Sequence, residues 1–558
     1  MLSLQCVAYA HPNKDILFSD LGLVVSRQEK LALVGNNGAG KSTLLRLLAG
    51  ELQPSAGSVL TDTRPYYVPQ VFGQFNSHTV AEVLGIDRKL EALQGILAGD
   101  VTGDNLLLLG DDWTLEERCR EAFGHWGIGG IGLTQKMGGL SGGQKTRVFL
   151  AGIMIHGSET VLLDEPSNHL DSHSRSILYD YIRNTRNTLV VVSHDRTLLN
   201  LLDRVAEVGR RGITVYGGNY DFYAGQKRIA MDALDQDIRS QEKALRKARE
   251  TEREAVQRQQ KLDARGKKKQ EKAGLPTISM NTFRNSAEKS TARMKDVHAE
   301  KVESIGEQLD QLRKDQPYKD KMRMGFDDPE LHGGKVLVDL KGVNFGLAHP
   351  PARPPSESVA DRTPSPSESI ARPMLWQQSL DLTILSGQRL AISGANGSGK
   401  TTLIRMILGE LQPSEGSVAR AEFTSVYIDQ DYSLIDDTIS VAVQAQAFNS
   451  GGLQEHEIKN RLARFLFGPE HWDKPCGALS GGEKMRLCLC CLTIASQAPD
   501  MIVLDEPTNN LDIQNIEILT AAISEYRGTL VLVSHDERFL KEAGVEARGS
   551  GVQLDHFL

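Results

Sequence analysis

The sequence predicts an α/β protein in which two P-loop domains are joined by a long antiparallel helical hairpin. The first observation is a repeat: "GNNGAGKSTLLRLLAGELQPSAGSV" at 35–59 matches "GANGSGKTTLIRMILGELQPSEGSV" at 394–418, and three shorter motifs recur behind it in the same order. The second is the charged stretch between the copies, which is almost free of Gly and Pro from 226 to 270. We therefore expect a first domain at 1–222, a hairpin linker at 223–333 and a second domain at 334–558.

The composition is that of a soluble globular protein, with 558 residues, 40% hydrophobic and 24% charged. No apolar run is long enough to span a bilayer and no secretory signal is present at the start, so a cytoplasmic location is expected. The net charge of −8 argues against nucleic acid coating the whole surface. Three of the six cysteines lie in "CLCC" at 488–491, which we interpret as small apolar residues of a buried helix, because no second CxxC pair completes a metal site.

Each copy contains a P-loop motif, GxxxxGK[ST], at 35–42 and at 394–401. An apolar strand precedes each motif and a helix follows, so that backbone N–H groups and a positive helix N-terminus surround phosphates. We expect Lys41 and Lys400 to neutralise the β- and γ-phosphates, while Ser42 and Thr401 place a hydroxyl on Mg²⁺. The residues predicted to bind nucleotide are Gly35, Asn36, Asn37, Gly38, Ala39, Gly40, Lys41, Ser42 and Thr43 in the first loop, and Gly394, Ala395, Asn396, Gly397, Ser398, Gly399, Lys400, Thr401 and Thr402 in the second.

Two acids end a buried strand in each copy, in "TVLLDE" and "MIVLDE". Asp164 and Asp505 can hold the metal through water, and they belong to the predicted ATP-binding set. Glu165 and Glu506 are the candidate general bases that polarise the attacking water. A carboxylate pair at a strand end is often structural, but its recurrence beside a P-loop favours catalysis.

Four further polar residues are functional candidates because they occur at equivalent positions in both copies. His194 and His535 end the next strands, in "VVVSHD" and "VLVSHD", and we expect them to contact the γ-phosphate as catalytic residues. Gln70 and Gln430 close strands in "YVPQ" and "YIDQ" and are expected to reach the metal and water. The predicted Mg²⁺ residues are therefore Ser42, Gln70, Thr401 and Gln430.

The motifs "LSGGQ" at 140–144 and "LSGGE" at 479–483 open helices with a serine and two glycines. Such a helix N-terminus is a second place where backbone N–H groups can hold an anion. The residues predicted to contact nucleotide here are Ser141, Gly142 and Gly143 in the first copy and Ser480, Gly481 and Gly482 in the second.

In this order, the P-loop, glutamine, LSGG[QE], acid pair and histidine resemble the ATP-binding cassette ATPases. The duplicated form, with "EPSNHLD", "LSGGE" and a long charged linker, looks like the ABC-F family. The resemblance implies two P-loop ATP-binding cassette domains that hydrolyse ATP with Mg²⁺, in a monomer whose cassettes close head to tail. Lys41 would then share a site with Ser480–Gly482, and Lys400 with Ser141–Gly143. Ser167 stands where Thr is usual, and Asn510 where the first copy has His169, but neither change removes a catalytic group.

The same resemblance implies a translation factor that binds the ribosome near the tRNA exit site and reaches toward the peptidyl-transferase centre with its linker. Some members of the family protect that centre from antibiotics and others rescue or regulate translation, and the sequence leaves both open. Two other readings remain: the ATPase of a transporter with a separate membrane chain, and a DNA-repair ATPase. Repair relatives place their coiled coil inside a cassette, whereas here it lies between the cassettes. We expect rRNA and tRNA as partners, and neither membrane nor DNA.

The linker has an apolar stripe and a basic tip. The stripe falls at 3/4 spacing on Met231, Leu234, Ile238, Leu245, Ala248, Ala255 and Leu262, and returns on Val302, Ile305, Leu309 and Leu312. The tip, at about 265–290, is broken by Gly274 and Pro276. Residues 261–295 hold ten Lys and Arg against three acids, a net charge of +7 in an acidic chain, which predicts contact with phosphates. The candidate RNA-binding residues are Lys267, Lys268, Lys269 and Arg284.

The two copies differ in two insertions. The first copy carries 20 extra residues within 75–135, where the segment at 106–129 is predicted to be helical. This addition either contacts the ribosome or is an ordinary subdomain. The second copy carries a Pro/Ser-rich insert at 348–373 with seven prolines, which we expect to be a disordered loop.

Overall fold

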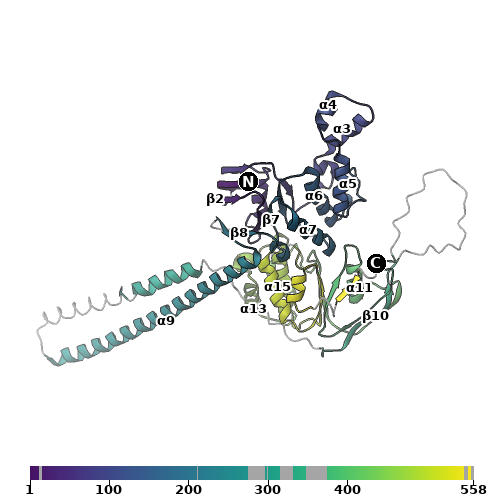
Figure 1. Cartoon of the computed structure of the whole chain (residues 1–558). Helices are drawn as coiled ribbons and strands as arrows, with labels where there is room; N and C mark the ends of the chain where they lie inside the picture. The colour runs from purple at the N-terminus through teal and green to yellow at the C-terminus, as the bar shows by residue number, and fades with distance from the viewer. Residues whose placement is uncertain are drawn as a thin grey trace. The chain divides into compact units, whose positions relative to one another are not determined.

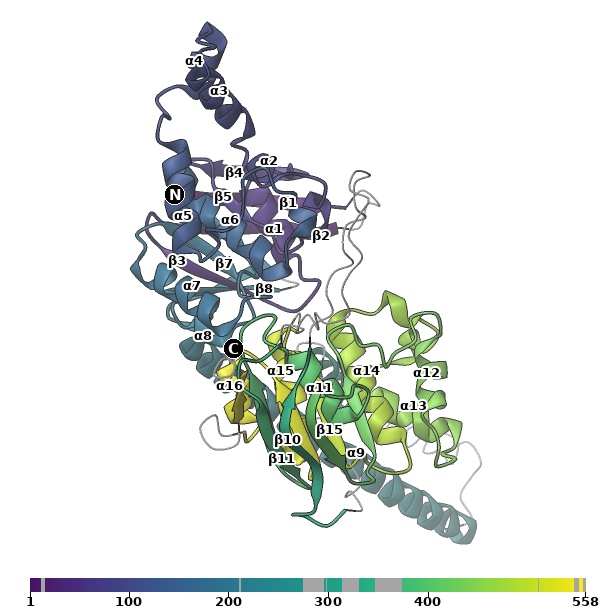
Figure 2. The same ribbon diagram turned by 90° about the vertical axis from the view of Figure 1, so that its right-hand side faces the viewer.

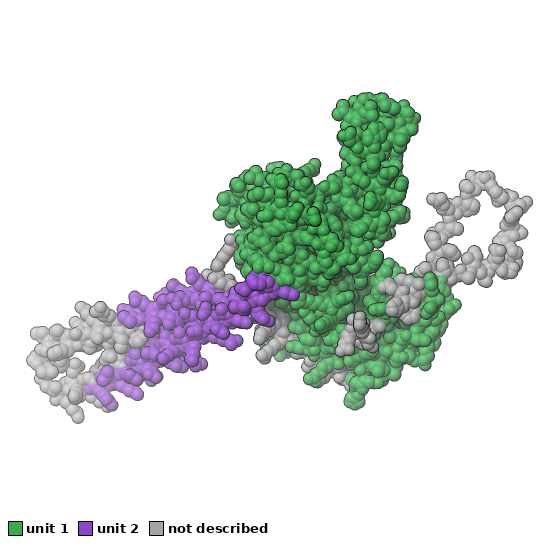
Figure 3. Space-filling view, viewed as in Figure 1, with its two compact units in different colours: residues 1–220, 322–558 green, residues 221–321 purple. Residues whose placement is uncertain are grey.

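The computed structural model describes residues 1–11, 16–209, 212–273, 296–297, 299–313, 331–346, 374–509, 511–545 and 551–554. The chain divides into two compact units, one formed by 1–220 with 322–558 and the other by 221–321 (Figures 1 and 3). The Pro/Ser-rich insert at 348–373, Arg284 and most of the basic tip lie outside the described residues, and Lys267, Lys268 and Lys269 are described only as helical backbone. The predicted boundaries at residues 222 and 333 stay predictions.

The first unit contains two α/β cassettes, which we call cassette 1 (1–216) and cassette 2 (331–554). The main sheet of cassette 1 has the strand order β5-β6-β7-β3-β8-β9, with parallel pairing except between β8 and β9. The apolar runs of its central strands are buried on both faces, as expected of a parallel sheet covered by helices. Its strands are β3 (Lys30–Val34), β5 (Tyr66–Val68), β6 (Thr160–Asp164), β7 (Thr188–Val192), β8 (Arg204–Gly209) and β9 (Gly212–Tyr216).

Cassette 2 repeats this sheet in the order β14-β15-β16-β12-β17, and all its pairs are parallel. Its strands are β12 (Arg389–Ser393), β14 (Ser425–Ile428), β15 (Met501–Asp505), β16 (Thr529–Val533) and β17 (Gly551–Gln553). Each cassette adds an antiparallel three-stranded sheet, ordered β2-β1-β4 and β11-β10-β13. These strands are β1 (Leu2–Ala10), β2 (Ile16–Val25), β4 (Ala56–Thr61), β10 (Val336–Asn344), β11 (Leu380–Leu385) and β13 (Glu415–Arg420).

Helices cover the sheets and begin where the motifs predict. The helices of cassette 1 are α1 (Lys41–Leu48), α2 (Val80–Leu84), α3 (Asp87–Leu97), α4 (Gly103–Leu109), α5 (Leu115–His125), α6 (Gly142–His156), α7 (Ser172–Asn184) and α8 (Arg196–Leu199). Those of cassette 2 are α11 (Lys400–Leu408), α12 (Val441–Ala447), α13 (Glu455–Arg464), α14 (Gly481–Ile494), α15 (Ile513–Glu525) and α16 (Glu537–Glu542). In the part of the chain that the structure describes, no helix combines the length and the apolar character needed to cross a membrane.

The extra residues of cassette 1 form α3 and α4, a helical pair with no counterpart between α12 and α13 of cassette 2. Figure 2 shows both helices projecting from the body of cassette 1. The pair has a small core of its own, formed by Ala92, Leu93 and Leu109. The segment predicted to be helical, 106–129, contains the end of α4 and all of α5, whereas α3 lies outside that prediction.

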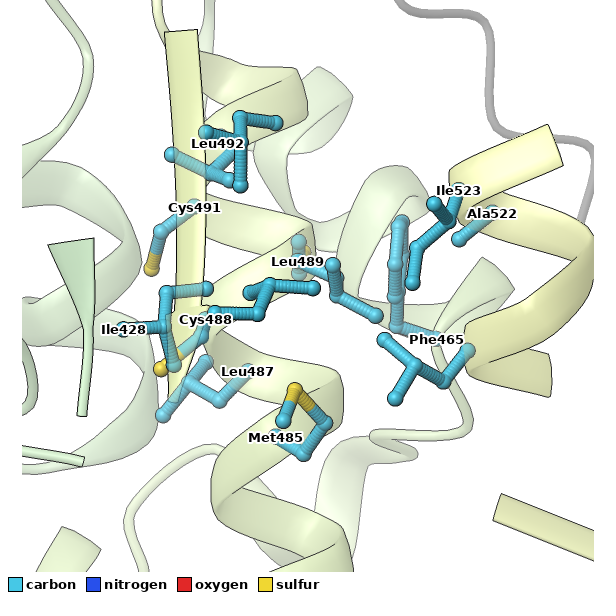
Figure 4. Close-up of a cluster of buried hydrophobic side chains, with 14 of the residues drawn as sticks. Ile428, Phe465, Met485, Leu487, Cys488, Leu489, Cys491, Leu492, Ala522 and Ile523 are labelled. Carbon is cyan, nitrogen blue, oxygen red and sulfur yellow. The ribbon is translucent and has the colours of Figure 1, made fainter. Parts of the chain in front are cut away.

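The "CLCC" cysteines lie in α14, inside the largest hydrophobic cluster of cassette 2 (Figure 4). Cys488, Cys490 and Cys491 are each 0% exposed, and they pack among residues such as Leu489 and Ile523. Burial raises the pKa of all three thiols, so each stays protonated and apolar. The interpretation of these cysteines as small core residues is confirmed.

The second unit is a helical hairpin. Its long arm α9 (Tyr220–Ala273) has 54 residues, which corresponds to roughly 80 Å of helix, and it ends just before Gly274. Residues 299–313 form a second helical segment, and Arg313 Nη2 lies 2.7 Å from Glu242 Oε1 of α9. Ile238 and Leu309 are buried, as the stripe predicts. The second helical segment and its ion pair with α9 agree with the antiparallel hairpin of the predicted fold class.

One member of the stripe is exposed. Met231, Leu234, Leu245, Ala248 and Ala255 are half-buried, but Leu262 is 59% exposed. Positions spaced at about 3.5 residues drift by about 20° per heptad around a straight α-helix, so the last position has rotated off the packed face. The prediction that Leu262 lies on the buried face is therefore wrong.

Candidate functional site

The motif residues of each cassette gather at the carboxyl ends of the parallel strands. In cassette 1 the P-loop follows the central strand β3, the acid pair ends β6, and His194 follows the intervening strand β7. In cassette 2 the same order places the P-loop after β12, the acids at β15 and His535 after β16. Because neighbouring parallel strands end at one edge of a sheet, residues distant in sequence form one site there.

Left-handed glycines shape each P-loop. Gly40 and Gly399 cap α1 and α11 with φ of 88° and 93°, a region that other residues rarely adopt. A Cβ on Gly40 would lie 2.3 Å from the Phe18 ring, so both backbone angle and space require glycine. The loop lysines point back into their own loops: Lys41 Nζ donates to Gly35 O at 2.7 Å, and Lys400 Nζ donates to Gly394 O at 2.7 Å. The ammonium groups thus lie within the loops that are predicted to bind phosphate.

The first acid of each pair sits among hydroxyl groups. Tyr427 OH donates to Asp505 Oδ2 at 3.1 Å, and Thr401 Oγ1 lies 3.4 Å from the same oxygen. In cassette 1, Tyr67 OH donates to Asp164 Oδ2 at 3.2 Å. Burial raises the pKa of both aspartates, and hydrogen bonds from hydroxyls such as that of Ser42 oppose this shift. The predicted metal residues Ser42, Thr401 and Gln430 thus lie within hydrogen-bonding reach of an aspartate.

Gln70 follows β5 by two residues, as Gln430 follows β14, and it is half-buried. The equivalent positions put both glutamines at the strand-end edge of their sheets. Gln430 also lines a cavity that is described below.

The second acid of each pair has a strained backbone. Glu165 and Glu506 have φ of 50° and 49°, a left-handed conformation that costs energy for a residue with a Cβ and that clusters at functional sites. Their N–H groups donate to Val192 O and Val533 O of the neighbouring strand, both at 2.8 Å, which holds the strained turn. Burial raises the pKa of both carboxyl groups, that of Glu506 to about 7. Each carboxylate is therefore basic for its type.

A neutral histidine faces each of these glutamates. His194 Nε2 lies 3.3 Å from Glu165 Oε1, and His535 Nε2 lies 3.3 Å from Glu506 Oε1. Burial, followed by the charge of the nearby P-loop lysine, lowers the pKa of each imidazole to about 3. Both rings are thus neutral at pH 7, with one N–H donor and one acceptor nitrogen.

The LSGG motifs open α6 and α14 with matching capping boxes. Ser141 accepts from Gln144 N while Gln144 Oε1 accepts from Ser141 N, and Ser480 and Glu483 make the same pair of bonds. This reciprocal bonding fixes the first turn, so that the helix N-terminus keeps a defined direction. The glycines leave the backbone accessible.

Residues of both cassettes line a cavity of about 180 Å³. Cassette 1 contributes its LSGG residues, and cassette 2 contributes the lysine of its P-loop and the second glutamate of its acid pair, Glu506. Asn396 Nδ2 of the second P-loop donates to His169 O of cassette 1 at 2.9 Å. The residues are Ser141, Gly142, Gly143, His169, Leu170 and Arg175 from cassette 1, with Asn396, Lys400, Gln430, Glu506, Asn509 and His535 from cassette 2.

A second contact between the cassettes lies at the first P-loop. The first P-loop contacts cassette 2 through Asn37 N, which donates to Asp512 Oδ2 at 3.2 Å. Asp512 caps α15 by accepting from Asn515 N.

Three kinds of site residue were not predicted from the sequence. Tyr67 and Tyr427 bond the first acids, and their signal was available, because each precedes its glutamine by three residues in both copies. Arg175 lines the cavity but has Ile516 at the equivalent repeat position, so comparison of the copies does not reveal it. Ser172, whose hydroxyl lies 3.0 Å from His535 Nδ1, has Ile513 at its repeat position.

Comparison with known proteins places this geometry in a family. The family model described as ABC transporter matches residues 18–168 and 377–509. An uncharacterized ABC transporter ATP-binding protein of Bacillus subtilis, YfmM, is 27% identical over 98% of this chain and 97% of its own length. ABC transporter F family member 5 of Arabidopsis thaliana is 29% identical over 94% of this chain and 71% of its own. The tylosin resistance ATP-binding protein TlrC of Streptomyces fradiae is 29% identical over 96% and 95%.

Solved structures have the same fold. An archaeal ribosome recycling factor, aABCE1, solved with the stalk protein aP1, aligns with a TM-score of 0.57 and 19% identity over 96% of this chain and 86% of its own. An RNase-L inhibitor aligns with a TM-score of 0.56 and 19% identity over 97% and 86%. The likeness covers both cassettes, and at this identity it concerns the fold. Since the family model covers about half of the chain and the relatives match nearly all of it, the chain belongs to the ATP-binding cassette family, in its ABC-F branch, and is an ATPase.

Proposed function

We propose that this chain is a ribosome-associated translation factor that acts in the cytoplasm as a monomer and binds ATP between its two cassettes. One observation carries the proposal for ATP: the cavity that joins Lys400, Glu506 and His535 of cassette 2 to Ser141, Gly142 and Gly143 of cassette 1. A nucleotide held there touches both cassettes, so its hydrolysis removes a link between them. Lys41 with Ser480–Gly482 is the second site of the proposal.

In each site the P-loop binds the phosphates. Backbone N–H groups of the loop and of the N-terminus of α1 or α11 bind the negatively charged phosphates. Lys41 or Lys400, which donates to carbonyls of its own loop in the structure, then donates to phosphate oxygens instead. Glu165 and Glu506 orient and deprotonate the attacking water, for which their raised pKa values suit them. His194 and His535 stand beside these carboxylates and face the γ-phosphate.

The residues fit Mg²⁺, which prefers oxygen ligands. Ser42 and Thr401 supply hydroxyls, Gln70 and Gln430 supply amide oxygens, and Asp164 and Asp505 lie within hydrogen-bonding reach of the hydroxyls, where they can bond metal-bound water. When bound, the ion neutralises charge on the β- and γ-phosphates. The chain itself orients the phosphates and holds the water next to the glutamates.

The first test removes both bases. Glu165→Gln with Glu506→Gln should leave ATP binding within about twofold of wild type, because the P-loops are unchanged, and should lower steady-state hydrolysis at least about a hundredfold. The closed protein should then stay on ribosomes and inhibit growth. ATP binding is measured by equilibrium titration and turnover by phosphate release. Turnover like that of wild type would reject both glutamates as bases.

Ribosome binding is the finer part of the proposal. It is supported by membership of the ABC-F branch and by the basic composition at 261–295, where a net charge of +7 interrupts an acidic chain. Lys267, Lys268 and Lys269 lie near the C-terminal end of α9 (Tyr220–Ala273). Cations clustered at the end of a long helix suit contact with RNA phosphates near the tRNA exit site and the peptidyl-transferase centre.

The second test reverses the charge of the basic tip. Replacing Lys267, Lys268, Lys269 and Arg284 by Glu should weaken ribosome binding at least about tenfold and flatten its dependence on salt, while ATP binding is unchanged. A matched control reverses four exposed cations of the same arm away from the tip, at Arg239, Lys243, Arg246 and Lys247. The measurement is co-sedimentation with ribosomes across a salt series, with and without ATP. Equal binding by the tip variant and wild type would exclude the tip as an RNA contact.

Protection from an antibiotic is part of the same proposal and rests on one likeness. TlrC, a tylosin resistance protein, matches this chain over nearly its whole length. The test expresses this chain, or its Glu165→Gln/Glu506→Gln variant, in a tylosin-sensitive strain and compares the susceptibility of the two strains to tylosin.

A further inference from the structure

The two copies differ at the turn that enters α7 and α15. Asp171 and Asp512 cap these helices in the same way, each accepting a hydrogen bond from the backbone N–H three residues on. The residues that follow are not equivalent. Cassette 1 has Ser172 and Arg175 where cassette 2 has Ile513 and Ile516, at the same distances from the capping aspartate.

Ser172 reaches across to the histidine of the other cassette. Its Oγ lies 3.0 Å from His535 Nδ1, although the residues are 363 positions apart in the chain. A hydroxyl bonded to Nδ1 of a neutral imidazole holds the orientation of the ring. In cassette 1 the equivalent nitrogen, His194 Nδ1, is buried, and the described residues offer it no hydrogen-bond partner.

Arg175 places a buried cation at the same site. It is 8% exposed, its Nε donates to Leu170 O at 3.1 Å, and it lines the cavity together with Lys400, Glu506 and His535. The Arg175 guanidinium therefore lines the same cavity as the Glu506 carboxylate and the His535 ring. Ile516, at the repeat position, is 2% exposed within the hydrophobic core of cassette 2.

We propose that Ser172 and Arg175 are positioning residues for the Lys400 site, and that the two ATP sites therefore hydrolyse ATP at different rates, the Lys400 site faster. Ser172 holds the His535 ring, and Arg175 orients the Glu506 carboxylate and adds positive charge beside the γ-phosphate. Groups that are already placed need no reorganisation when charge develops in the reaction. This inference rests on the proposed roles of Glu506 and His535.

The test measures each site alone. In the Glu165→Gln background only the Lys400 site has its base, and there Ser172→Ala and Arg175→Ile should each lower kcat about tenfold with KM within about twofold. In the Glu506→Gln background, where the working site is that of Lys41, the same substitutions should change kcat less than about twofold. Ser172→Thr, which keeps the hydroxyl, should restore most of the rate, and Ile513→Ala is the matched control in cassette 2.

Equal losses in both backgrounds would overturn the inference, because they would indicate a general effect on folding or closure. Loss of rate without rescue by Ser172→Thr would overturn the role of the hydroxyl.

A second measurement is independent of the glutamates. The ¹⁵N shifts of the His535 imidazole, assigned by difference with His535→Gln, should change in Ser172→Ala and stay in Ser172→Thr. An unchanged spectrum in Ser172→Ala rejects the inference. If both single glutamate variants turned over ATP like wild type, the proposed bases would be wrong, and this spectrum would still decide the role of Ser172.

Discussion

Each aspartate next to a candidate base is held by a tyrosine from the neighbouring strand. Tyr67 and Tyr427 come from β5 and β14, which pair in parallel with the strands that end in Asp164 and Asp505. The phenol donates and the carboxylate accepts, at 3.2 and 3.1 Å. Burial, followed by the charge of the aspartate, raises the pKa of both phenols far above neutrality, so the hydroxyl remains a donor at any working pH. A donor of this kind fixes which oxygen of the carboxylate faces the hydroxyls of the P-loop.

We predict that Tyr427→Phe lowers ATP turnover about three- to tenfold, because a hydrogen bond to a charged group is worth about 1.5–3 kcal/mol and only part of it bears on catalysis. The ring stays packed, so thermal stability should fall by less than about 2 °C. Tyr216→Phe is the control, since its hydroxyl bonds Glu207 at 3.3 Å outside the site. The role of the tyrosine is refuted if both variants turn over ATP at the wild-type rate.

At the scale of elements, α3 and α4 form the clearest difference between the cassettes. Their shared core is small, and apolar side chains of this segment are exposed: Leu97 of α3 is 73% exposed, Leu107 of α4 is 84% exposed, and Val101, between the two helices, is 62% exposed. The rest of cassette 1 is packed around its sheet without them, as cassette 2 is. The pair is thus an addition to a cassette that is complete in its absence.

We therefore predict that replacing residues 87–111 with residues 448–453 of cassette 2 leaves ATP turnover within about twofold of wild type. The physical reason is that α3 and α4 contribute no residue to the nucleotide cavity. Turnover and melting temperature are the measurements, with a four-residue insertion at 448–453 of cassette 2 as a control for changed loop length. A loss of turnover above about tenfold would show that the pair supports the site.

At the scale of the whole molecule, an ion pair joins the two cassettes away from the nucleotide cavity. Arg196 Nη1 of α8 donates to both oxygens of Glu542 in α16, at 3.1 and 3.0 Å. The side chain of Arg196 is 7% exposed and that of Glu542 is 35% exposed. A guanidinium that is buried at a junction is costly unless its carboxylate is present, so the pair favours the closed arrangement.

We predict that Glu542→Gln lowers ATP turnover about three- to tenfold, since the unpaired Arg196 makes closure less favourable by about 1 kcal/mol. Adding Arg196→Met should restore much of the rate, because the uncompensated charge is then removed. Glu455→Ala, which breaks the exposed pair with Lys459, is the control. A double variant as slow as Glu542→Gln alone would contradict this account.

The repeated motifs made most of the fold predictable. A P-loop requires a strand before it and a helix after it, and an apolar run ending in two acids requires a buried strand, so β3, β6, β12 and β15 followed from short stretches of sequence. The apolar stripe of α9 was predicted from the 3/4 spacing of its residues. The prediction is wrong at Leu262, because spacing alone does not describe how successive positions turn around the helix axis. Both tyrosines were predictable from the repeat. The partners of their hydroxyls depend on strand register, that of β5 against β6 for Tyr67 and that of β14 against β15 for Tyr427.

The two cassettes and the expected chemistry of their shared motifs could be predicted from the sequence because these patterns are local and occur twice. The hairpin occurs once, and it could be predicted from the local spacing of its apolar residues. The three-dimensional structure was needed to show that Ser172 bonds His535, that Arg175 lines the cavity of Glu506, and that Arg196 pairs with Glu542. These contacts join residues more than 300 positions apart, at places where the copies differ. Such contacts depend on how one cassette packs on the other, and no local pattern in either copy records that packing.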